Sequence, residues 1–439
     1  MSNGNTTWTT SGYQVLVDGK PFFANGVSYS PLPWGACTAF QPYGDFTIET
    51  WSSVWQRDVG LMRQNKVNVF KTYNTLNEVQ TPGGDINHGP CLDACWNGGA
   101  NPVFMLMGYA PANNVSIYVA STWSQQANVN ARKKIAGELV ALAKTYAGYP
   151  AVMGFVMANE INANNVVYGS NNQPNAAFFQ FWNDVANEIG KVAPGKLTLL
   201  ANVDDSMNTP TAGNPYMTAA NFVWGINSYR GNWTNSNGFD NLFSTFYTAT
   251  QQPAVSTGQP NPKPLLLTEW GAPSSTHSDF PASPSTGTMT AMSKQQMADL
   301  STYVAGHYNN MIANRSDTGA GVCGGGAYFE WTDEWWKADP IQCNAPNAAP
   351  ACYAGVWNPG PNMSFQGNFP GGYWDEEGFG LHSIAPVSPS TRVPPVPGGC
   401  VGPWDPEINQ PYPPDQLTAL AHAKALFELF AKHPPGGAV

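Results

Sequence analysis

The stretch AVMGFVMANE (151–160) joins a run of apolar residues directly to an amide and a carboxyl side chain, Asn159 and Glu160. The apolar run has the length and composition of a strand that is buried on both faces, as strands in parallel sheets are. Such a strand needs no Asn-Glu pair at its end in order to pack. The polar end therefore indicates that this strand delivers functional side chains to one edge of a parallel sheet.

Seven further apolar runs alternate with stretches of helical periodicity. We predict the eight strands at 22–30, 67–74, 102–110, 151–160, 197–205, 222–230, 264–271 and 326–336. We predict helices at 51–66, about 128–147, around 178–189, 293–313 and 415–432. This alternation predicts an α/β fold, the (β/α)8 TIM barrel. A doubly wound open sheet is the alternative, but NGVSYSPLPWG (25–35) is not the Gly-rich phosphate loop that it would need.

The region 338–413 is rich in Pro, Gly and Asn and is too long for an ordinary loop. We interpret it as an excursion between the eighth strand and the last helix, lying over the mouth of the barrel. The whole chain, 1–439, is then a single barrel domain.

Composition limits the class of partner. Charged residues make up 11% of the chain, against about 25% in an average soluble protein, and aromatic residues 13%, with 16 Trp. The net charge of −10 argues against nucleic acid or an anionic membrane, and no apolar run approaches the ~20 residues of a membrane span. We expect a neutral polysaccharide or oligosaccharide that stacks on aromatic rings, and a monomeric protein.

Cysteine usage suggests an oxidising compartment. Most of the cysteines lie in stretches that we interpret as loops, such as GPCLDACWNGG (89–99) and IQCNAPNAAPACY (341–353), which favours disulfides and a secreted or periplasmic protein. The seven are Cys37, Cys91, Cys95, Cys323, Cys343, Cys352 and Cys400. Cys343–Cys352 is a plausible local bridge, and Cys323 is our candidate for a free thiol. The first residues, MSNGNTTWTT, have no signal-peptide pattern.

Two of the predicted strands end in a glutamate. The fourth ends in Glu160 and the seventh, LLLTEWG, in Glu269. A barrel brings the carboxyl ends of its strands to one mouth. Two facing carboxyl groups are what cleavage of a glycosidic bond needs, because one donates a proton to the leaving oxygen while the other attacks or activates water. The alternative is a pair of unrelated solvated acids.

With their neighbours, these glutamates resemble clan A of the glycoside hydrolases, which are retaining enzymes. The resemblance rests on Asn-Glu at the fourth strand, Glu at the seventh and Tyr in GINSYR at the sixth, and covers roughly residues 20–432. It implies that Glu160 is the general acid/base and Glu269 the nucleophile. It also implies that Asn159 binds the sugar 2-hydroxyl and that Tyr229 hydrogen-bonds the nucleophile.

Other strand ends offer candidate substrate contacts. Lys71 stands where many clan members carry an Arg that supports the nucleophile, although Lys lacks the bidentate fork. Trp331 is expected beneath the reacting sugar, where the clan typically has a Trp. The remaining candidates, whose alternative role is packing, are Asn25, Tyr29, Trp34, Tyr73, Tyr109, Trp233, Trp270, Glu334 and Trp335. The acidic turn in YWDEEGFGL (373–381) is interpreted as a solvated turn or a contact at the substrate rim, in preference to a Ca²⁺ site.

Rival chemistries have little support in the sequence. The six His form no HExxH or paired zinc spacing, and the chain has no GxSxG elbow and no phosphate-binding P-loop. We therefore expect catalysis that requires no cofactor and no metal.

Three segments suggest the sugar. DGKPFFANGVSY (18–29), DVGLMRQNKVNVFKTYN (58–74) and VWGINSYRGN (223–232) are similar to fungal β-1,3-glucanosyltransferases and their bacterial relatives, whereas EWTDEWWK (330–337) departs from that pattern. The resemblance implies a β-glucan, with the β-1,3 linkage favoured. The alternatives are transglycosylation by the same residues, a retaining β-mannanase or β-galactanase, and a carbohydrate-binding pseudoenzyme without turnover.

Overall fold

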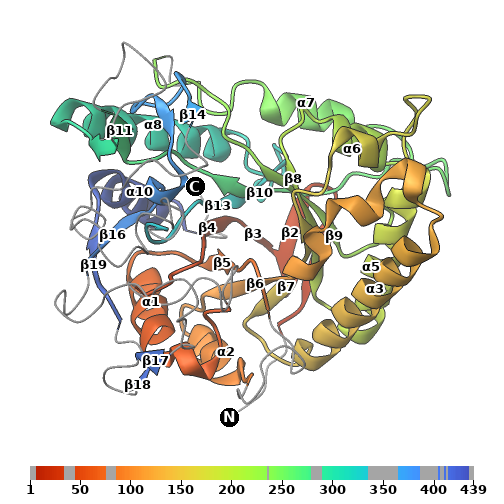
Figure 1. Ribbon diagram of the computed structural model, residues 1–439, viewed down its shortest axis with the longest axis horizontal. Helices are drawn as coiled ribbons and strands as arrows, with labels where there is room; N and C mark the ends of the chain where they lie inside the picture. Colours follow the sequence, from red (N-terminus) through yellow and green to blue (C-terminus); the bar gives the residue numbers. More distant parts are fainter. Residues whose placement is uncertain are drawn as a thin grey trace.

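The computed structural model describes residues 6–33, 45–75, 86–234, 237–277, 289–334, 364–385, 404–405, 410–411 and 414–434. Eight parallel strands close into a barrel in the order β10-β13-β4-β5-β6-β7-β8-β9 (Figure 1). Their bounds are β4 Ala24–Ser28, β5 Val69–Lys71, β6 Phe104–Gly108, β7 Val152–Asn159, β8 Leu197–Val203, β9 Phe222–Asn227, β10 Leu265–Trp270 and β13 Cys323–Tyr328. The closed barrel confirms the predicted fold class.

Helices surround the barrel (Figure 1). They are α1 Ser52–Gln64, α2 Gly89–Trp96, α3 Gln126–Tyr146, α4 Asn164–Val167, α5 Ala176–Val192, α6 Asn208–Gly213, α7 Leu242–Ala249, α8 Lys294–Ala313 and α10 Ala421–Lys432. The four predicted between 51 and 313 lie where apolar periodicity placed them. The short strand pairs outside the barrel are β11 Ser275–His277 with β12 Met289–Ala291, β14 Ser364–Phe365 with β15 Tyr373–Trp374, β16 His382–Ala385 with β19 Gln416–Ala419, and β17 Trp404–Asp405 with β18 Gln410–Pro411.

Two predictions about helices need correction: where the last helix begins, and a stretch expected to be a loop that is helical. The last helix begins at Ala421 instead of 415, because 416–419 pairs as β19 with β16, a partner more than thirty residues away in the chain. The stretch GPCLDACW, expected to be a loop, forms α2. Its proline stands in the first turn, where a missing N–H costs nothing, and Cys91, Leu92 and Cys95 bury one face.

The eighth strand runs over Cys323–Tyr328 instead of 326–336. Three consecutive glycines, which normally weaken a strand, hid its start. They are needed here because neighbouring strands approach closely: Gly325 has φ +99°, and a Cβ there would lie 2.2 Å from the carbonyl oxygen of Ala24. Residues 329–334 therefore follow the strand as a loop.

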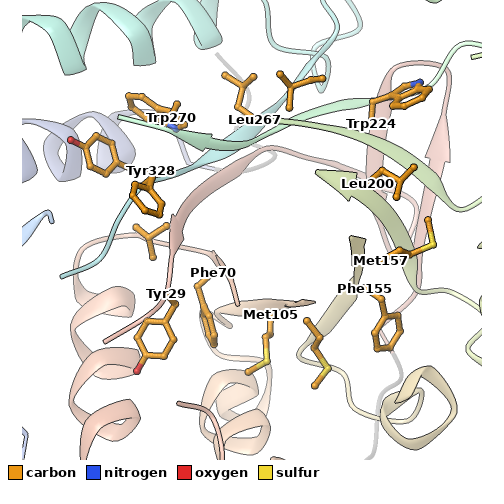
Figure 2. Packing of buried hydrophobic residues seen from close by; sticks show 14 of the residues in the cluster. Tyr29, Phe70, Met105, Phe155, Met157, Leu200, Trp224, Leu267, Trp270 and Tyr328 are labelled. Atoms are coloured by element: carbon orange, nitrogen blue, oxygen red, sulfur yellow. The ribbon is translucent and has the colours of Figure 1, made fainter. Parts of the chain in front are cut away.

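Apolar side chains pack on both sides of the strand ring. The labelled side chains of Figure 2, among them Tyr29 and Trp270, lie on its outer side, toward the helices. A separate cluster fills the interior. At the amino end of the strands a small sheet, which the sequence analysis did not predict, closes the barrel. Its strands are β1 Trp8–Ser11, β2 Gln14–Val17 and β3 Lys20–Phe22. Trp8 packs edge-on against Phe104 with ring centroids 4.8 Å apart, so the opposite end is the one left for a site.

The cysteines seen in the described residues are thiols. Cys91, Cys95 and Cys323 are free and buried, so the free Cys323 agrees with expectation and the predicted disulfide environment of Cys91 and Cys95 does not. The predicted Cys343–Cys352 bridge lies outside the described residues. Among the helices described, none is long and apolar enough to cross a membrane.

Candidate active site

A cavity of about 570 Å³ opens at the carboxyl ends of the barrel strands. Most of its lining comes from strand ends and the loops that follow them, joined by two residues of the 364–385 segment. The described lining residues are Ser30, Tyr73, Asn113, Asn159, Glu160, Val203, Asn227, Tyr229, Glu269, Phe329, Glu334, Trp374 and Glu376. Both candidate catalytic glutamates face this one cavity.

Glu269, on β10, is 6% exposed and accepts three hydrogen bonds. The ammonium group of Lys71 lies 2.7 Å from Oε1, and the hydroxyl of Tyr73 donates to the same oxygen at 2.9 Å. The hydroxyl of Tyr229 donates to Oε2 at 2.9 Å. Burial and the nearby Glu269 carboxylate raise the pKa of both tyrosines well above the ordinary value, so both keep the protons that they donate. The carboxylate of Glu269 is thereby fixed in orientation and faces an adjacent positive charge.

Glu160 lies in a different environment directly after β7. Its backbone has φ +56°, which is uncommon outside glycine, and its N–H donates to the carbonyl of Ala201 at 2.7 Å. The side chain is exposed to the cavity, and Oε1 accepts a hydrogen bond from Asn227 at 2.9 Å. Desolvation within the cleft raises the pKa of Glu160, and the charge of Glu269 adds to the rise. Glu160 is thus the acid suited to hold a proton.

Asn159 links the two glutamates. Its Oδ1 accepts from Lys71 Nζ at 3.1 Å and from Asn227 Nδ2 at 3.3 Å. Lys71 continues to Glu269 and Asn227 continues to Glu160. A single polar network therefore spans the site, and changing any member alters the surroundings of both acids.

The structure brings together seven of the residues that the sequence analysis selected. Six line the cavity, and Lys71 lies beneath it against Glu269. The six are Asn159, Glu160, Tyr73, Tyr229, Glu269 and Glu334. Their roles in binding and catalysis stay predictions.

Three other candidates lie away from the cavity and bond elsewhere. Asn25 donates to the carbonyl of His433 at 3.1 Å and accepts from Tyr308 at 2.9 Å, between the barrel and its outer helices. The hydroxyl of Tyr29 donates to Asp58 at 3.0 Å. The hydroxyl of Tyr109 donates to Glu138 of α3. The sequence located the strand ends but not which alternate side chain points inward, and a slip of one residue reverses the face.

Three of the five tryptophans that we selected as candidate substrate contacts are described, and none of the three lines the cavity. Trp270 is fully buried on the outer side of β10, with its ring centroid 5.0 Å from that of Tyr328 (Figure 2). Trp331 is fully buried, 4.2 Å from the ring of His382, and does not floor the cavity. Trp233 packs at the edge of the core and does not line the cavity. Trp34 and Trp335 lie outside the described residues.

Phe329 lines the cavity where Trp331 was expected. Its ring packs edge-on to Tyr73 and Tyr229, with centroids 6.3 and 6.4 Å away. The correction follows from the early end of β13, because Phe329 is the first residue after that strand. The sequence analysis passed over Phe329 in favour of the larger indole.

Asn113, Asn227, Trp374 and Glu376 are cavity residues that the sequence analysis did not select. Asn227 could have been found, since it stands in the same GINSYR motif as Tyr229. Trp374 had no comparable signal, because it comes from a segment more than a hundred residues after Glu269. Glu376 belongs to the acidic turn that was interpreted as a solvated turn or a contact at the substrate rim, and its place in the cavity lining agrees with the second interpretation. The acidic turn is not solvated as a whole: Asp375 and Glu377 are fully buried, and only Glu376 faces the cavity.

Within the described ranges, no group of three or more His, Cys, Asp or Glu is placed to hold a metal ion. The cavity chemistry of these residues is that of carboxyl, amide and phenol groups beside aromatic rings.

No family model matches the chain. No curated protein matches it either. Solved structures do match. The β-glucuronidase from Lactobacillus rhamnosus has 13% identity and a TM-score of 0.54, covering 98% of this chain and 53% of that one. A Ruminococcus gnavus β-glucuronidase has 11% identity and a TM-score of 0.54, with coverages of 98% and 53%.

The GH2 β-galacturonidase from Eisenbergiella tayi, bound to galacturonate, has 11% identity and a TM-score of 0.51, with coverages of 98% and 55%. This chain therefore spans about half the length of the structures it matches. At such identities the likeness shows the fold alone.

Proposed function

We propose that this protein is a retaining β-glycosidase that cleaves a neutral β-linked glycan through a covalent glycosyl-enzyme. One observation carries the proposal: Glu160 and Glu269 face one cavity from strands β7 and β10, in environments that differ in charge and exposure. In retaining glycosidases, two carboxyl groups in different environments divide the acid and nucleophile roles.

In the first step, a carboxylate oxygen of Glu269 attacks the anomeric carbon. The carbon–oxygen bond to the leaving sugar breaks, and Glu160 gives its proton to the departing oxygen. In the second step, Glu160 takes a proton from water as the water oxygen displaces Glu269. Lys71, Tyr73 and Tyr229 orient the nucleophile and need not move during either step.

A neutral sugar is favoured over a uronide. The cavity lining includes four carboxyl groups, those of Glu160, Glu269, Glu334 and Glu376, and none of its described residues is Lys, Arg or His. Lys71 lies beneath the cavity, already paired with Glu269. Among the described lining residues, a sugar carboxylate would meet like charge and no compensating cation. The uronidases with this fold would thus differ from our protein in substrate.

The three segments similar to β-1,3-glucanosyltransferases make a β-1,3-glucan the first substrate to try. The same glycosyl-enzyme reacts with water or with another sugar hydroxyl, so hydrolysis and transfer share the residues named above. Products longer than the starting oligosaccharide would report transfer.

The test combines trapping with a substrate panel. A 2-deoxy-2-fluoro-β-glucosyl donor with a dinitrophenyl leaving group should give a one-to-one adduct, mapped by mass spectrometry to the peptide that contains Glu269. Laminari-, cello-, manno- and galacto-oligosaccharides and an aryl β-glucuronide form the panel. We expect cleavage of neutral β-glycosides with first release of the β-anomer. Inverted product, an adduct on another peptide, or turnover of the glucuronide alone would refute the proposal.

A further inference from the structure

The segment that carries β15 and the following short helix η8 (Glu376–Gly378) presents alternate side chains in opposite directions. Trp374 and Glu376 line the cavity, whereas Asp375 between them is fully buried away from it. We propose that Trp374 and Glu376 form a sugar-binding subsite on the leaving-group side of Glu160, and that Asp375 is the positioning residue that holds this subsite in place. The inference rests on the proposed glycosidase function and adds that the leaving group is itself a sugar.

The pair has the chemistry of a sugar subsite. Trp374 is half-buried, so part of its indole is available to the cavity, where an aromatic face can pack against the apolar face of a pyranose. Its Nε1 donates to Oε1 of Glu376 at 3.2 Å, which ties the carboxylate to the ring. A carboxylate accepts hydrogen bonds from sugar hydroxyls without requiring a charged ligand.

Other aromatic rings pack against the indole of Trp374. Its centroid lies 4.5 Å from that of Tyr229, at an interplanar angle of 78°, and 5.1 Å from that of Phe379. Tyr229 in turn donates to Glu269. The indole is therefore packed against Tyr229, which donates a hydrogen bond to the proposed nucleophile, and it lines the same cavity.

The carboxyl groups of Glu376 and Glu334, which also line the cavity, raise the pKa of different residues. Burial is the main cause of the raised pKa of Glu160, with the charges of Glu269 and Glu376 adding to it. Glu334 instead adds to the raised pKa of Tyr73, for which burial and the charge of Glu269 are the larger causes. Glu376 lines the same cavity as Glu160, and its charge acts on this proposed donor of the proton to the leaving sugar.

Asp375 fastens the subsite to the barrel. Its carboxylate accepts from the hydroxyl of Ser275 at 2.6 Å and lies 2.9 and 3.1 Å from Nε2 of His277. The ring of His277 stacks on Tyr373 with centroids 3.7 Å apart. Ser275 and His277 belong to β11, which follows β10, so the strand that carries Glu269 leads to the anchor of Trp374 and Glu376.

Further contacts make the attachment continuous. The hydroxyl of Thr276 donates to the carbonyl of Gly371 at 2.9 Å, and the N–H of Ser274 donates to the carbonyl of Gly378 at 2.7 Å. The segment is therefore bound to β11 before, at and after Asp375. Loosening the central carboxylate should displace Trp374 and Glu376 without unfolding the barrel.

The experiment compares two substrates with the same glycone. One is an oligosaccharide that the enzyme cleaves, and the other is the corresponding 2,4-dinitrophenyl glycoside, whose leaving group is not a sugar. The value of kcat/KM reports the steps up to the first bond cleavage. In Trp374→Ala and Glu376→Gln, we expect the ratio of kcat/KM for the oligosaccharide to that for the aryl glycoside to fall by about tenfold or more. Glu376→Gln is isosteric and keeps the test open if Trp374→Ala folds poorly.

Asp375→Asn should lower the same ratio of kcat/KM for the oligosaccharide to kcat/KM for the aryl glycoside. The matched control is Asp317→Asn, which also alters a buried carboxylate, one paired with Arg315 and remote from the cavity. Glu188→Gln, an exposed change on α5, controls for charge. Both should leave the ratio unchanged.

Parallel loss on both substrates in Trp374→Ala and Glu376→Gln would overturn the subsite, as would no loss on either. An unchanged ratio in Asp375→Asn, with a lowered ratio in the other two, would overturn the positioning role. If the wild-type protein turns over neither substrate, the proposed function fails instead, and the two failures are distinct.

Discussion

The ammonium nitrogen of Lys71 lies 2.7 Å from Oε1 of Glu269, and both side chains are buried in the barrel mouth. They come from strands β5 and β10, which are 198 residues apart at this contact. A carboxylate that is buried in this way would be costly without its counter-ion. The ion pair therefore stabilises the buried carboxylate in the fold and also orients the proposed nucleophile.

Lys71→Met should lower kcat/KM on the best substrate by about a hundredfold or more, because Glu269 loses its adjacent positive charge. Lys71→Arg should recover part of that loss, since the charge returns with a different geometry. Steady-state kinetics on each variant measure both effects. Lys196→Met is the control, because Lys196 is equally buried but bonds to backbone carbonyls outside the cavity. Similar kinetic loss in that control would attribute the effect to folding.

Glu160→Gln should separate substrates by their need for a proton. Activity on an oligosaccharide should fall by about a thousandfold, whereas a dinitrophenyl glycoside should still form the glycosyl-enzyme, because its leaving group needs no acid. Adding azide should then restore turnover by replacing water in the second step, and the product should be a β-glycosyl azide. Mass spectrometry of that product checks the assignment. If azide has no effect, Glu160 is not the acid/base.

The pH profile should follow the raised pKa of Glu160. Because the acid must be protonated for the first step, kcat/KM on an oligosaccharide should persist above the ordinary Glu value of 4.5 and decline as Glu160 loses its proton. In Glu376→Gln one of the charges that raise this pKa is absent, so the alkaline limb should move to lower pH. Glu188→Gln should leave the limb in place. Movement toward higher pH in Glu376→Gln would contradict the arrangement of charges described above.

Asp333 gives a prediction about stability. Burial raises its pKa from 3.8 to about 8, and its Oδ1 accepts from the N–H of Gly380 at 3.0 Å. Between those values the folded protein holds a proton that the unfolded chain releases, so the free energy of unfolding should decrease as pH rises through that window. The decrease attributable to Asp333 approaches about 1.4 kcal/mol per pH unit.

Asp333→Asn should remove this contribution, because the amide keeps the acceptor and does not titrate. Urea unfolding at several pH values from about 4 to about 8 measures the slope in both proteins. An identical slope in wild type and Asp333→Asn would show that the carboxyl group is ionised in the folded state. Asp317→Asn again serves as the comparison for a buried carboxylate elsewhere.

The barrel was predictable because its signals are local. Strands such as 152–159 are apolar up to their last residue, and the helices repeat apolar residues at helical spacing, so element type and order follow from neighbouring residues. The small sheet β1–β3 was not predicted, although its strands are joined by short local turns, with Ser11 opposite Gln14 and Val17 opposite Lys20. The β16–β19 pair was not predicted because its partners are distant in sequence. The glycine-rich start of β13 was missed for the same reason: the need for glycine appears only when β4 is beside it.

The candidate site likewise contains residues that could be predicted from local sequence and residues that could not. Glu160, Glu269 and Tyr229 were found because each stands where an apolar strand ends. Trp331 and Trp270 were chosen for their residue type, but the direction of a side chain after a strand end depends on backbone irregularities, such as the shifts in register between β10 and β13. Trp374 and Glu376 reach the cavity from a separate segment. A contact at the substrate rim was one interpretation of the acidic turn, but which of its residues faces the cavity appears only in the three-dimensional contacts.

The proposed catalytic residues and the indole–carboxylate pair are carried by different pieces of chain. Glu160, Glu269 and Lys71 belong to barrel strands or their immediate ends, whereas Trp374 and Glu376 belong to a segment pinned from outside through Asp375. Variation in the stretch that β11 holds, 371–378, should therefore alter the proposed subsite while Glu160, Glu269 and Lys71 keep their places. In evolutionary terms, the proposed preference for a glycan chain can change independently of the barrel strands.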